Sequence, residues 1–302
     1  MAPRFGSVVT AMVTPFDASG AVDLETAVSL ARHLEGSGSG GIVLAGSTGE
    51  GPVLSDDEKV ALFAAVKAGV SIPILAATGS NDTVHSARLS KAAQDVGVDG
   101  LLVVTPYYNR PSSVGLEAHF KEIANSTSLP ILLYDVPIRT GRRIGSELII
   151  ELSKVPNIVG VKDATGDVAE AARIVAETPD DYLLYCGDDS LTLPFLSIGA
   201  VGIISVASHW AGTGFAEMIS LHRAGDVAGA QRVNARLQAS YDFESTPEFP
   251  NPMPAKAACR AMGFAVGNCR LPNAPAPAAL DDEAALIVKN SHDLFPASRS
   301  FA

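Results

Sequence analysis

Residues 158–166 read Ile-Val-Gly-Val-Lys-Asp-Ala-Thr-Gly, an apolar run that ends on a lysine and passes directly into a polar turn. Residues 167–177 then carry an amphipathic helical pattern. A short apolar strand, a polar loop and an amphipathic helix form the repeating unit of a parallel α/β sheet. The same order recurs on both sides of this stretch.

Eight apolar runs of this kind follow one another along the chain. They start about 20–35 residues apart, which is the length of one strand–loop–helix unit, and they cover residues 7–12, 41–45, 74–77, 100–104, 131–134, 158–162, 182–186 and 201–205. Eight parallel strands are the number at which such a sheet closes on itself. An open doubly wound sheet is the alternative, and the lack of a strand pattern after Ser205 favours the barrel.

Helical patterns separate the runs and continue after the last one. Residues 55–58, Ser-Asp-Asp-Glu, form a capping box that opens one of these helices. Helices are expected over residues 23–34, 55–66, 81–96, 114–124 and 167–177, and then over 225–241, 254–262 and 281–292, with an irregular connection at 271–279. The sequence therefore predicts an α/β fold: a (β/α)8 TIM barrel in residues 1–224 and a C-terminal helical extension in residues 225–302.

The composition narrows the class of protein. The chain has 302 residues, and 22 Lys and Arg against 33 Asp and Glu give a net charge of −11, which disfavours nucleic acid and anionic membranes as partners. Cys186, Cys259 and Cys269 show no paired spacing, as in a reducing compartment. No apolar run is long enough to span a membrane, and no signal-peptide pattern precedes Val8. We expect a cytoplasmic protein.

Lys162 is the most informative side chain because a lysine at the end of a buried strand is costly to place there. It could extend into solvent or pair with Asp163. Its chemical use would be imine formation, because burial disfavours the charged form of an amine and leaves it nucleophilic toward carbonyls.

Other chemistries lack their residues at the predicted strand ends, where a barrel enzyme carries its active site. Metal catalysis would need several imidazole or carboxylate ligands, but the six histidines lie mostly in predicted helices, and His209 after the last strand has no second imidazole nearby. Residues 36–41 match a dinucleotide-binding glycine pattern, yet they precede a strand instead of following one. Residues 46–51 lack the lysine of a phosphate loop. We expect no metal and no cofactor.

The strand ends carry hydroxyls, phenols and one guanidinium. Tyr134 could be a core tyrosine, but its strand precedes that of Lys162, which favours a catalytic role. Tyr107 and Tyr108 could pack at a subunit interface. Arg139 could anchor its own loop, or it could bind a substrate carboxylate with its planar fork.

Four stretches resemble one known family in order and spacing: Gly-Ser-Thr-Gly-Glu at 46–50, Pro-Tyr-Tyr-Asn-Arg-Pro at 106–111, Tyr-Asp-Val-Pro-Ile-Arg-Thr-Gly at 134–141 and Gly-Val-Lys-Asp-Ala-Thr-Gly-Asp at 160–167. The chain is similar over nearly its whole length to the dihydrodipicolinate synthase family of pyruvate-dependent class I aldolases. Arg139 is the feature that points to this family within the superfamily, which also includes N-acetylneuraminate lyase.

The resemblance implies a role for each matching residue. Lys162 would form the imine with pyruvate, and Tyr134 would be the acid/base group beside it. Ser47 or Thr48 would link Tyr134 to Tyr108, which would reach the site from a neighbouring subunit of a homotetramer. Thr48 would also bind the pyruvate carboxylate, Arg139 would bind the carboxylate of L-aspartate 4-semialdehyde, and backbone groups near Gly187 and Ile204 would shape the floor of the site.

At several positions this chain has a residue that differs from the usual one in the family, and each difference leads to an expectation. Ser47 stands where the family usually has threonine, which would loosen the relay. Asp135 replaces the commoner asparagine and is expected to tune its loop without changing the reaction. At the family's lysine-feedback site this chain has Asp56, Lys59 and His85, so we expect weak or absent inhibition by lysine.

Two other functions remain open at this point. One is a lyase or aldolase that acts on a sugar acid or another 2-keto acid. The other is a non-catalytic protein that binds pyruvate, which the presence of the lysine, the tyrosine and both hydroxyls disfavours.

Overall fold

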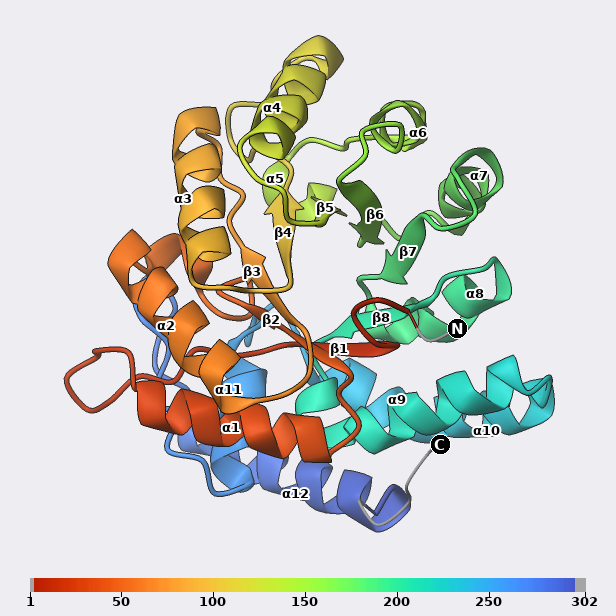
Figure 1. The fold of residues 1–302 in the computed structure, drawn as a ribbon. Coiled ribbons are helices and arrows are strands. Elements are labelled where there is room, and N and C mark those ends of the chain that lie inside the picture. Colours follow the sequence, from red (N-terminus) through yellow and green to blue (C-terminus); the bar gives the residue numbers. More distant parts are fainter. Residues whose placement is uncertain (1–2, 297–302) are drawn as a thin grey trace.

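The eight apolar runs form a closed barrel of parallel strands in the computed structural model, which describes residues 3–296 (Figure 1). Each strand pairs with the next, and β1 pairs with β8. The strands are β1 Val8–Ala11, β2 Gly41–Leu44, β3 Ile74–Ala77, β4 Gly100–Val104, β5 Ile131–Asp135, β6 Ile158–Asp163, β7 Leu183–Cys186 and β8 Gly202–Ser205. The predicted barrel is confirmed, and every predicted strand lies within two residues of its position.

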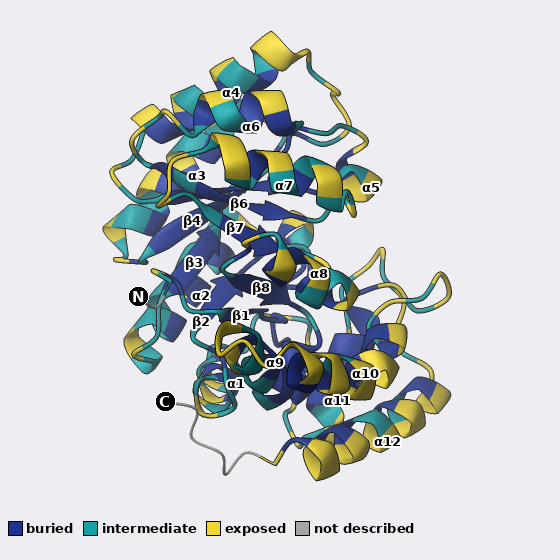
Figure 2. Ribbon diagram, turned by 90° about the vertical axis from the view of Figure 1, so that its right-hand side faces the viewer, coloured by how far each residue is buried: buried dark blue, intermediate teal, exposed yellow. Residues whose placement is uncertain are grey.

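The strands are buried on both faces, which explains their continuous apolar sequence (Figure 2). One set of side chains fills the barrel interior, among them Phe5, Leu75, Leu132 and Tyr185. The other set packs outward under the helices and belongs to the large core. Cys186 is fully buried in that core.

Helices surround the barrel on the outside (Figure 1). The predicted capping box is present at the start of α2, where Ser55 and Glu58 each bond the backbone amide of the other. The helices and short 3-10 turns are α1 Leu24–Gly36, η1 Gly51–Val53, α2 Asp56–Gly69, α3 Thr83–Asp95, α4 Ser113–Asn125, α5 Pro137–Thr140, α6 Ser146–Leu152, α7 Val168–Glu177, η2 Asp189–Leu191, α8 Thr192–Ser197, α9 Ser208–Arg223, α10 Val227–Phe243, α11 Met253–Ala261 and α12 Ala278–Leu294.

Four helices have no counterpart among the predicted ranges. Helices α5, α6 and α8 have seven residues or fewer, which is too short for a clear helical period. Helix α9 is longer, but a non-helical residue, Ala211, interrupts it, and most of its N-terminal half is buried. The connection predicted over residues 271–279 ends slightly earlier, because α12 begins at Ala278.

The last three helices gather on the side of the barrel that carries β1, β2 and α9 (Figure 1). Helix α10 packs on α9, and α11 packs on α12 and α9. Their buried side chains join the large core of the barrel. The division at residue 224/225 stays a prediction, and residues 1, 2 and 297–302 of the two predicted parts lie outside the described residues.

Among residues 3–296, no helix combines the length and apolar character needed to cross a membrane.

Candidate active site

Lys162 and Tyr134 are neighbours on adjacent strands. They are register partners on β6 and β5, so their side chains lie on the same face of the sheet. The Nζ atom of Lys162 lies 4.4 Å from the centre of the Tyr134 ring. Lys162 is 5% exposed and Tyr134 is 7% exposed. Two alternatives to imine formation were open for Lys162, extension into solvent and pairing with Asp163. The low exposure shows that the first of them is wrong.

The floor of the site is made by the barrel interior. Ile204 on β8 is buried in the same interior cluster as Tyr134. Gly187 follows β7, and a Cβ atom on it would lie 2.9 Å from Cε of Lys162. A side chain at position 187 would therefore displace the lysine. The roles that the resemblance implies for Gly187 and Ile204 stay predictions.

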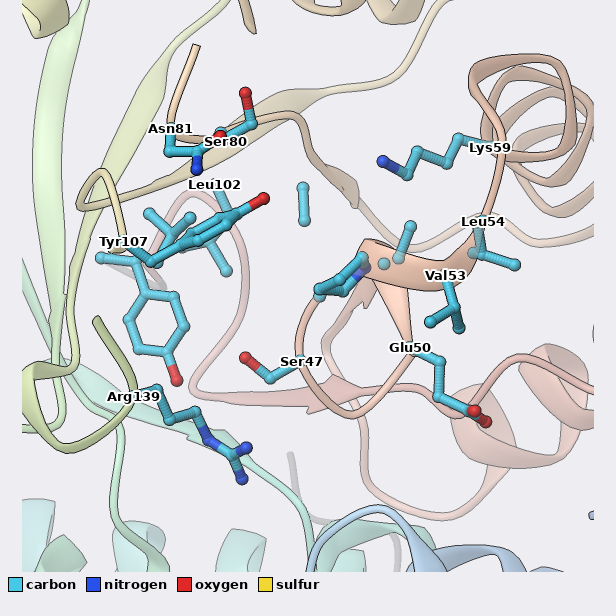
Figure 3. Close-up of a pocket in the computed structure, with 18 of the residues that line it drawn as sticks. Ser47, Glu50, Val53, Leu54, Lys59, Ser80, Asn81, Leu102, Tyr107 and Arg139 are labelled. Carbon is cyan, nitrogen blue, oxygen red and sulfur yellow. The ribbon is translucent and has the colours of Figure 1, made fainter. Parts of the chain in front are cut away.

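A cavity of about 690 Å³ opens at this end of the barrel. Ser47, Tyr134 and Arg139 line it, together with Tyr107. In Figure 3, Tyr107 and Arg139 lie on one side, the hydroxyl of Ser47 points toward that side, and Lys59 enters from the other. The cavity thus combines hydroxyl groups with a guanidinium near Tyr134, as a site for small carboxylate ligands requires.

The loop after β2 is a compact turn that depends on two glycines. A Cβ atom on Gly51 would lie 2.1 Å from the carbonyl oxygen of Ala45, and one on Gly49 would lie 2.9 Å from the amide nitrogen of Ala45. The loop closes through a hydrogen bond from the Gly51 amide to the carbonyl of Gly46. The glycines allow this close approach, and the turn presents Ser47 to the cavity and buries Thr48.

Polar residues from the C-terminal part of the chain hold this loop, and sequence reasoning missed them. Lys256 on α11 forms an ion pair with Glu50 at 2.7 Å, and both side chains are 1% exposed. The other oxygen of Glu50 accepts a hydrogen bond from the amide of Arg270. Asn251 donates from Nδ2 to Oγ1 of Thr48 at 2.9 Å. The one available signal was a lysine among small apolar residues at 255–258.

Tyr108 is not part of the cavity in a single chain. Its side chain is 89% exposed, and its backbone has a positive φ of 71°. Tyr107, its neighbour in sequence, lines the cavity instead. The structure therefore brings Lys162, Tyr134, Gly187 and Ile204 together and leaves Tyr108 outside.

His209, the histidine after the last strand, is a buried structural residue. Its Nε2 accepts a hydrogen bond from the amide of Val13, and its Nδ1 lies 2.7 Å from the carbonyl oxygen of Val206. Burial lowers the pKa of His209 to about 4, so the ring is neutral. Within residues 3–296, no group of three or more His, Cys, Asp or Glu side chains is placed to hold a metal ion.

Asp135 is a buried carboxyl group directly after Tyr134. Its Oδ2 accepts a hydrogen bond from the amide of Ile144 at 2.9 Å, which closes the base of the loop that carries Arg139. Its other oxygen has no partner in the described chain. Burial raises the pKa of Asp135 to about 6, against the backbone hydrogen bonds, and it also raises the pKa of Asp163, its register partner.

We expect Asp135→Asn to stabilise the protein at neutral pH. Between the ordinary carboxyl pKa of 3.8 and the folded value of about 6, the folded protein binds more protons than the unfolded chain, so its stability falls as the pH rises. The variant avoids this loss, which is at most about 3 kcal/mol. Its advantage should be absent below about pH 4 and complete above about pH 7.

Urea unfolding across this pH range measures the effect. Asp282→Asn, at an exposed position on α12, serves as the control and should change little at any pH. An advantage for Asp135→Asn that does not depend on pH would contradict the prediction. The kinetic parameters of the variant should match those of the parent, as expected from the sequence.

Comparison with known proteins agrees with this geometry. The model of the dihydrodipicolinate synthetase family matches residues 4–291. A 4-hydroxy-tetrahydrodipicolinate synthase of Halalkalibacterium halodurans is 48% identical over 273 residues, which cover 90% of this chain and 93% of that protein.

Two solved structures have closely similar folds. Dihydrodipicolinate synthase from Cyanidioschyzon merolae, with lysine bound, has a TM-score of 0.92 at 40% identity and covers 96% of this chain and 99% of its own. The chloride-inhibited enzyme from Acinetobacter baumannii, in complex with pyruvate, has a TM-score of 0.89 at 34% identity. The match covers 95% of this chain and 99% of that enzyme's chain.

Proposed function

This chain belongs to the dihydrodipicolinate synthetase family, and from that membership we propose that it acts as a 4-hydroxy-tetrahydrodipicolinate synthase. The reaction condenses pyruvate with L-aspartate 4-semialdehyde and belongs to the biosynthesis of diaminopimelate and lysine. The observation that carries the proposal is a buried lysine amine 4.4 Å from the centre of a tyrosine ring, near the carboxyl ends of two adjacent strands of a closed barrel.

The reaction begins with Lys162. Its amine attacks the keto carbon of pyruvate, the keto oxygen leaves as water, and an imine forms. Tyr134, whose ring centre lies 4.4 Å from the amine, carries a hydroxyl that can move protons in these steps. Arg139 and Thr48 offer charged and neutral hydrogen-bond donors for the carboxylates of the two substrates.

Carbon–carbon bond formation follows. Loss of a methyl proton from the imine gives an enamine, whose carbon attacks the aldehyde of the second substrate. The amine of that substrate then attacks the imine carbon, which closes the ring and releases Lys162. No external cofactor enters this scheme, because the imine nitrogen itself accepts the electron pair.

A coupled assay with pyruvate and L-aspartate 4-semialdehyde tests the function. N-acetylneuraminate and 2-keto-3-deoxy sugar acids should be assayed in parallel. We expect turnover only with the first pair. Turnover of a sugar acid without turnover of the semialdehyde would move the assignment to a lyase, and pyruvate binding without any turnover would support a non-catalytic protein.

We further propose that two chains pair through the loops around the cavity, within a homotetramer. Three exposed apolar side chains follow successive strands: Val84 lies in the first turn of α3, Tyr108 in the loop after β4, and Ile138 in the short helix α5. Hydrogen bonds connect the segments that follow β3, β4 and β5, since Asn109 donates to the carbonyl of Asn81 and the Tyr108 amide donates to the carbonyl of Thr140. Exposed apolar side chains of this kind are suited to burial against a second copy of the chain.

Mixing two inactive variants tests whether Tyr108 acts in the neighbouring subunit. Tyr108→Ala and Lys162→Ala should restore activity when they are dissociated and reassociated together, because a mixed dimer holds one complete site. At random pairing about a quarter of the sites are complete. Lys162→Ala mixed with Tyr134→Phe is the control, because both residues belong to one chain and no complete site forms. Mixed dimers seen by native mass spectrometry without recovered activity would place Tyr108 elsewhere.

We expect lysine not to inhibit at submillimolar concentrations. Asp56, which lines the cavity, is already bound by His85 at 2.8 Å and Arg88 at 2.9 Å. Lys59 lines the same wall, so a lysine ammonium would meet cations there and no unpaired carboxylate of Asp56. Initial rates at increasing lysine concentration measure this, and half-inhibition below 1 mM would contradict it.

The cytoplasm is the proposed location. The cysteines Cys186, Cys259 and Cys269 are free thiols, which suits a reducing compartment.

A further inference from the structure

The amide of Asn251 connects the C-terminal part of the chain to Thr48. Its Nδ2 donates to the Thr48 hydroxyl oxygen across 203 residues of sequence. Asn251 is 8% exposed, lines the cavity and stands immediately before the Pro-Met start of α11. The motif that carries Ser47 and Thr48 gives no sign of this partner.

This contact determines the direction of the Thr48 hydroxyl proton. A hydroxyl group has one proton to donate and two lone pairs to accept with. The Thr48 oxygen accepts from Asn251, and no carbonyl, carboxylate or hydroxyl in residues 3–296 accepts its proton. The proton is therefore free for an acceptor on a bound ligand.

We infer that Asn251 is a positioning residue that holds the Thr48 hydroxyl as a donor toward the carboxylate of the bound keto acid. This inference rests on the proposed function, since it concerns how the same site binds pyruvate. Asn251 would therefore strengthen the binding of pyruvate whether or not the second substrate is present.

Neighbouring contacts hold Asn251 and Thr48 in position relative to each other. The buried pair of Glu50 and Lys256 joins the Thr48 loop to α11, the helix that follows Asn251. The Asn251 backbone amide also donates to Oγ of Ser245 at 3.3 Å. The Oδ1 atom of Asn251 is buried and has no partner among residues 3–296, so within that range the only hydrogen bond of this side chain is the one to Thr48.

Asn251→Asp is the most direct test. Aspartate has nearly the same shape, but its carboxylate cannot donate, and it would accept the Thr48 proton instead. We expect KM for pyruvate to rise by about tenfold to a hundredfold, the usual effect of one hydrogen bond to a charged group, with a smaller change in kcat. The pyruvate concentration that half-saturates borohydride trapping of Lys162 should rise by the same factor.

Matched variants separate positioning from a general structural effect. Ser245→Ala removes the contact to the Asn251 backbone and leaves its side chain in place, so trapping should stay at the parental concentration. In a Thr48→Val background, Asn251→Asp should add little, because its partner is gone. If Asn251→Asp does not fold, as judged by circular dichroism, Asn251→Ala takes its place in the same comparisons.

The outcomes are distinct. Parental half-saturation in the folded Asn251 variant, or an undiminished effect in the Thr48→Val background, would overturn the inference. A parental chain that pyruvate and borohydride do not modify at Lys162 would instead overturn the proposed function.

Discussion

Lys162→Arg is expected to lose activity by about 10³-fold or more, because removal of a covalent nucleophile eliminates the step on which the others depend. The guanidinium keeps the positive charge but cannot deprotonate to attack a carbonyl. Borohydride and pyruvate should add a reduced adduct to the peptide that contains residue 162 in the parent, and nothing at that position in the variant.

Two comparisons make this prediction specific. Lys59 lines the cavity and is the internal comparison, and peptide mapping should find it unmodified in the parent. Lys154→Arg, at an exposed position after α6, should retain parental activity and trapping. Parental turnover by Lys162→Arg, or an unmodified Lys162 in the parent, would remove the chemical basis of the proposed function.

Lys256→Met is expected to lower the free energy of unfolding by about 3–5 kcal/mol, because it leaves the carboxylate of Glu50 buried without its ion-pair partner. Burial lowers the pKa of Lys256, and the nearby Glu50 carboxylate opposes that shift. Since Glu50 belongs to the loop that carries Ser47 and Thr48, the variant should also bind pyruvate more weakly. Urea unfolding and the half-saturation of trapping measure the two effects.

The double variant Glu50→Gln with Lys256→Met provides the matched comparison. It removes the unpaired charge and should recover part of the lost stability. Lys289→Met breaks an exposed pair with Asp293 on α12 and should cost less than about 1 kcal/mol. A Lys256→Met protein as stable as the parent would contradict the prediction, and so would a double variant that recovers nothing.

The strands could be predicted from the sequence because their signal is local. Residues 74–77 and 100–104 were predicted with the bounds that β3 and β4 have in the structure. A strand buried on both faces is a continuous apolar run, whatever lies far away in the chain. Helices α5, α6 and α8 were missed because four to seven residues are too few to display a period of 3.6.

The residues of the site also differ in whether the sequence could predict their positions. Lys162 and Tyr134 each lie one residue before the end of adjacent strands, so their meeting follows from strand order. The exposure of Tyr108 follows from a loop conformation with positive φ, which its sequence does not reveal. The roles of Glu50 and Asn251 had no local signal, and that of Lys256 had only its position among small apolar residues, because each depends on a partner about two hundred residues away.

By itself, the sequence determined a barrel of eight strands and the residues that lie at its strand ends. Each strand shows its burial in a short stretch of sequence, and the order of the strands along the chain gives their order in the barrel. Only the tertiary structure decided which side chains hold the loop after β2. Barrel closure and the return of α11 bring residues 251 and 256 against that loop, and a hydrogen bond or a buried ion pair exists only where folding sets its two halves within about 3 Å of each other.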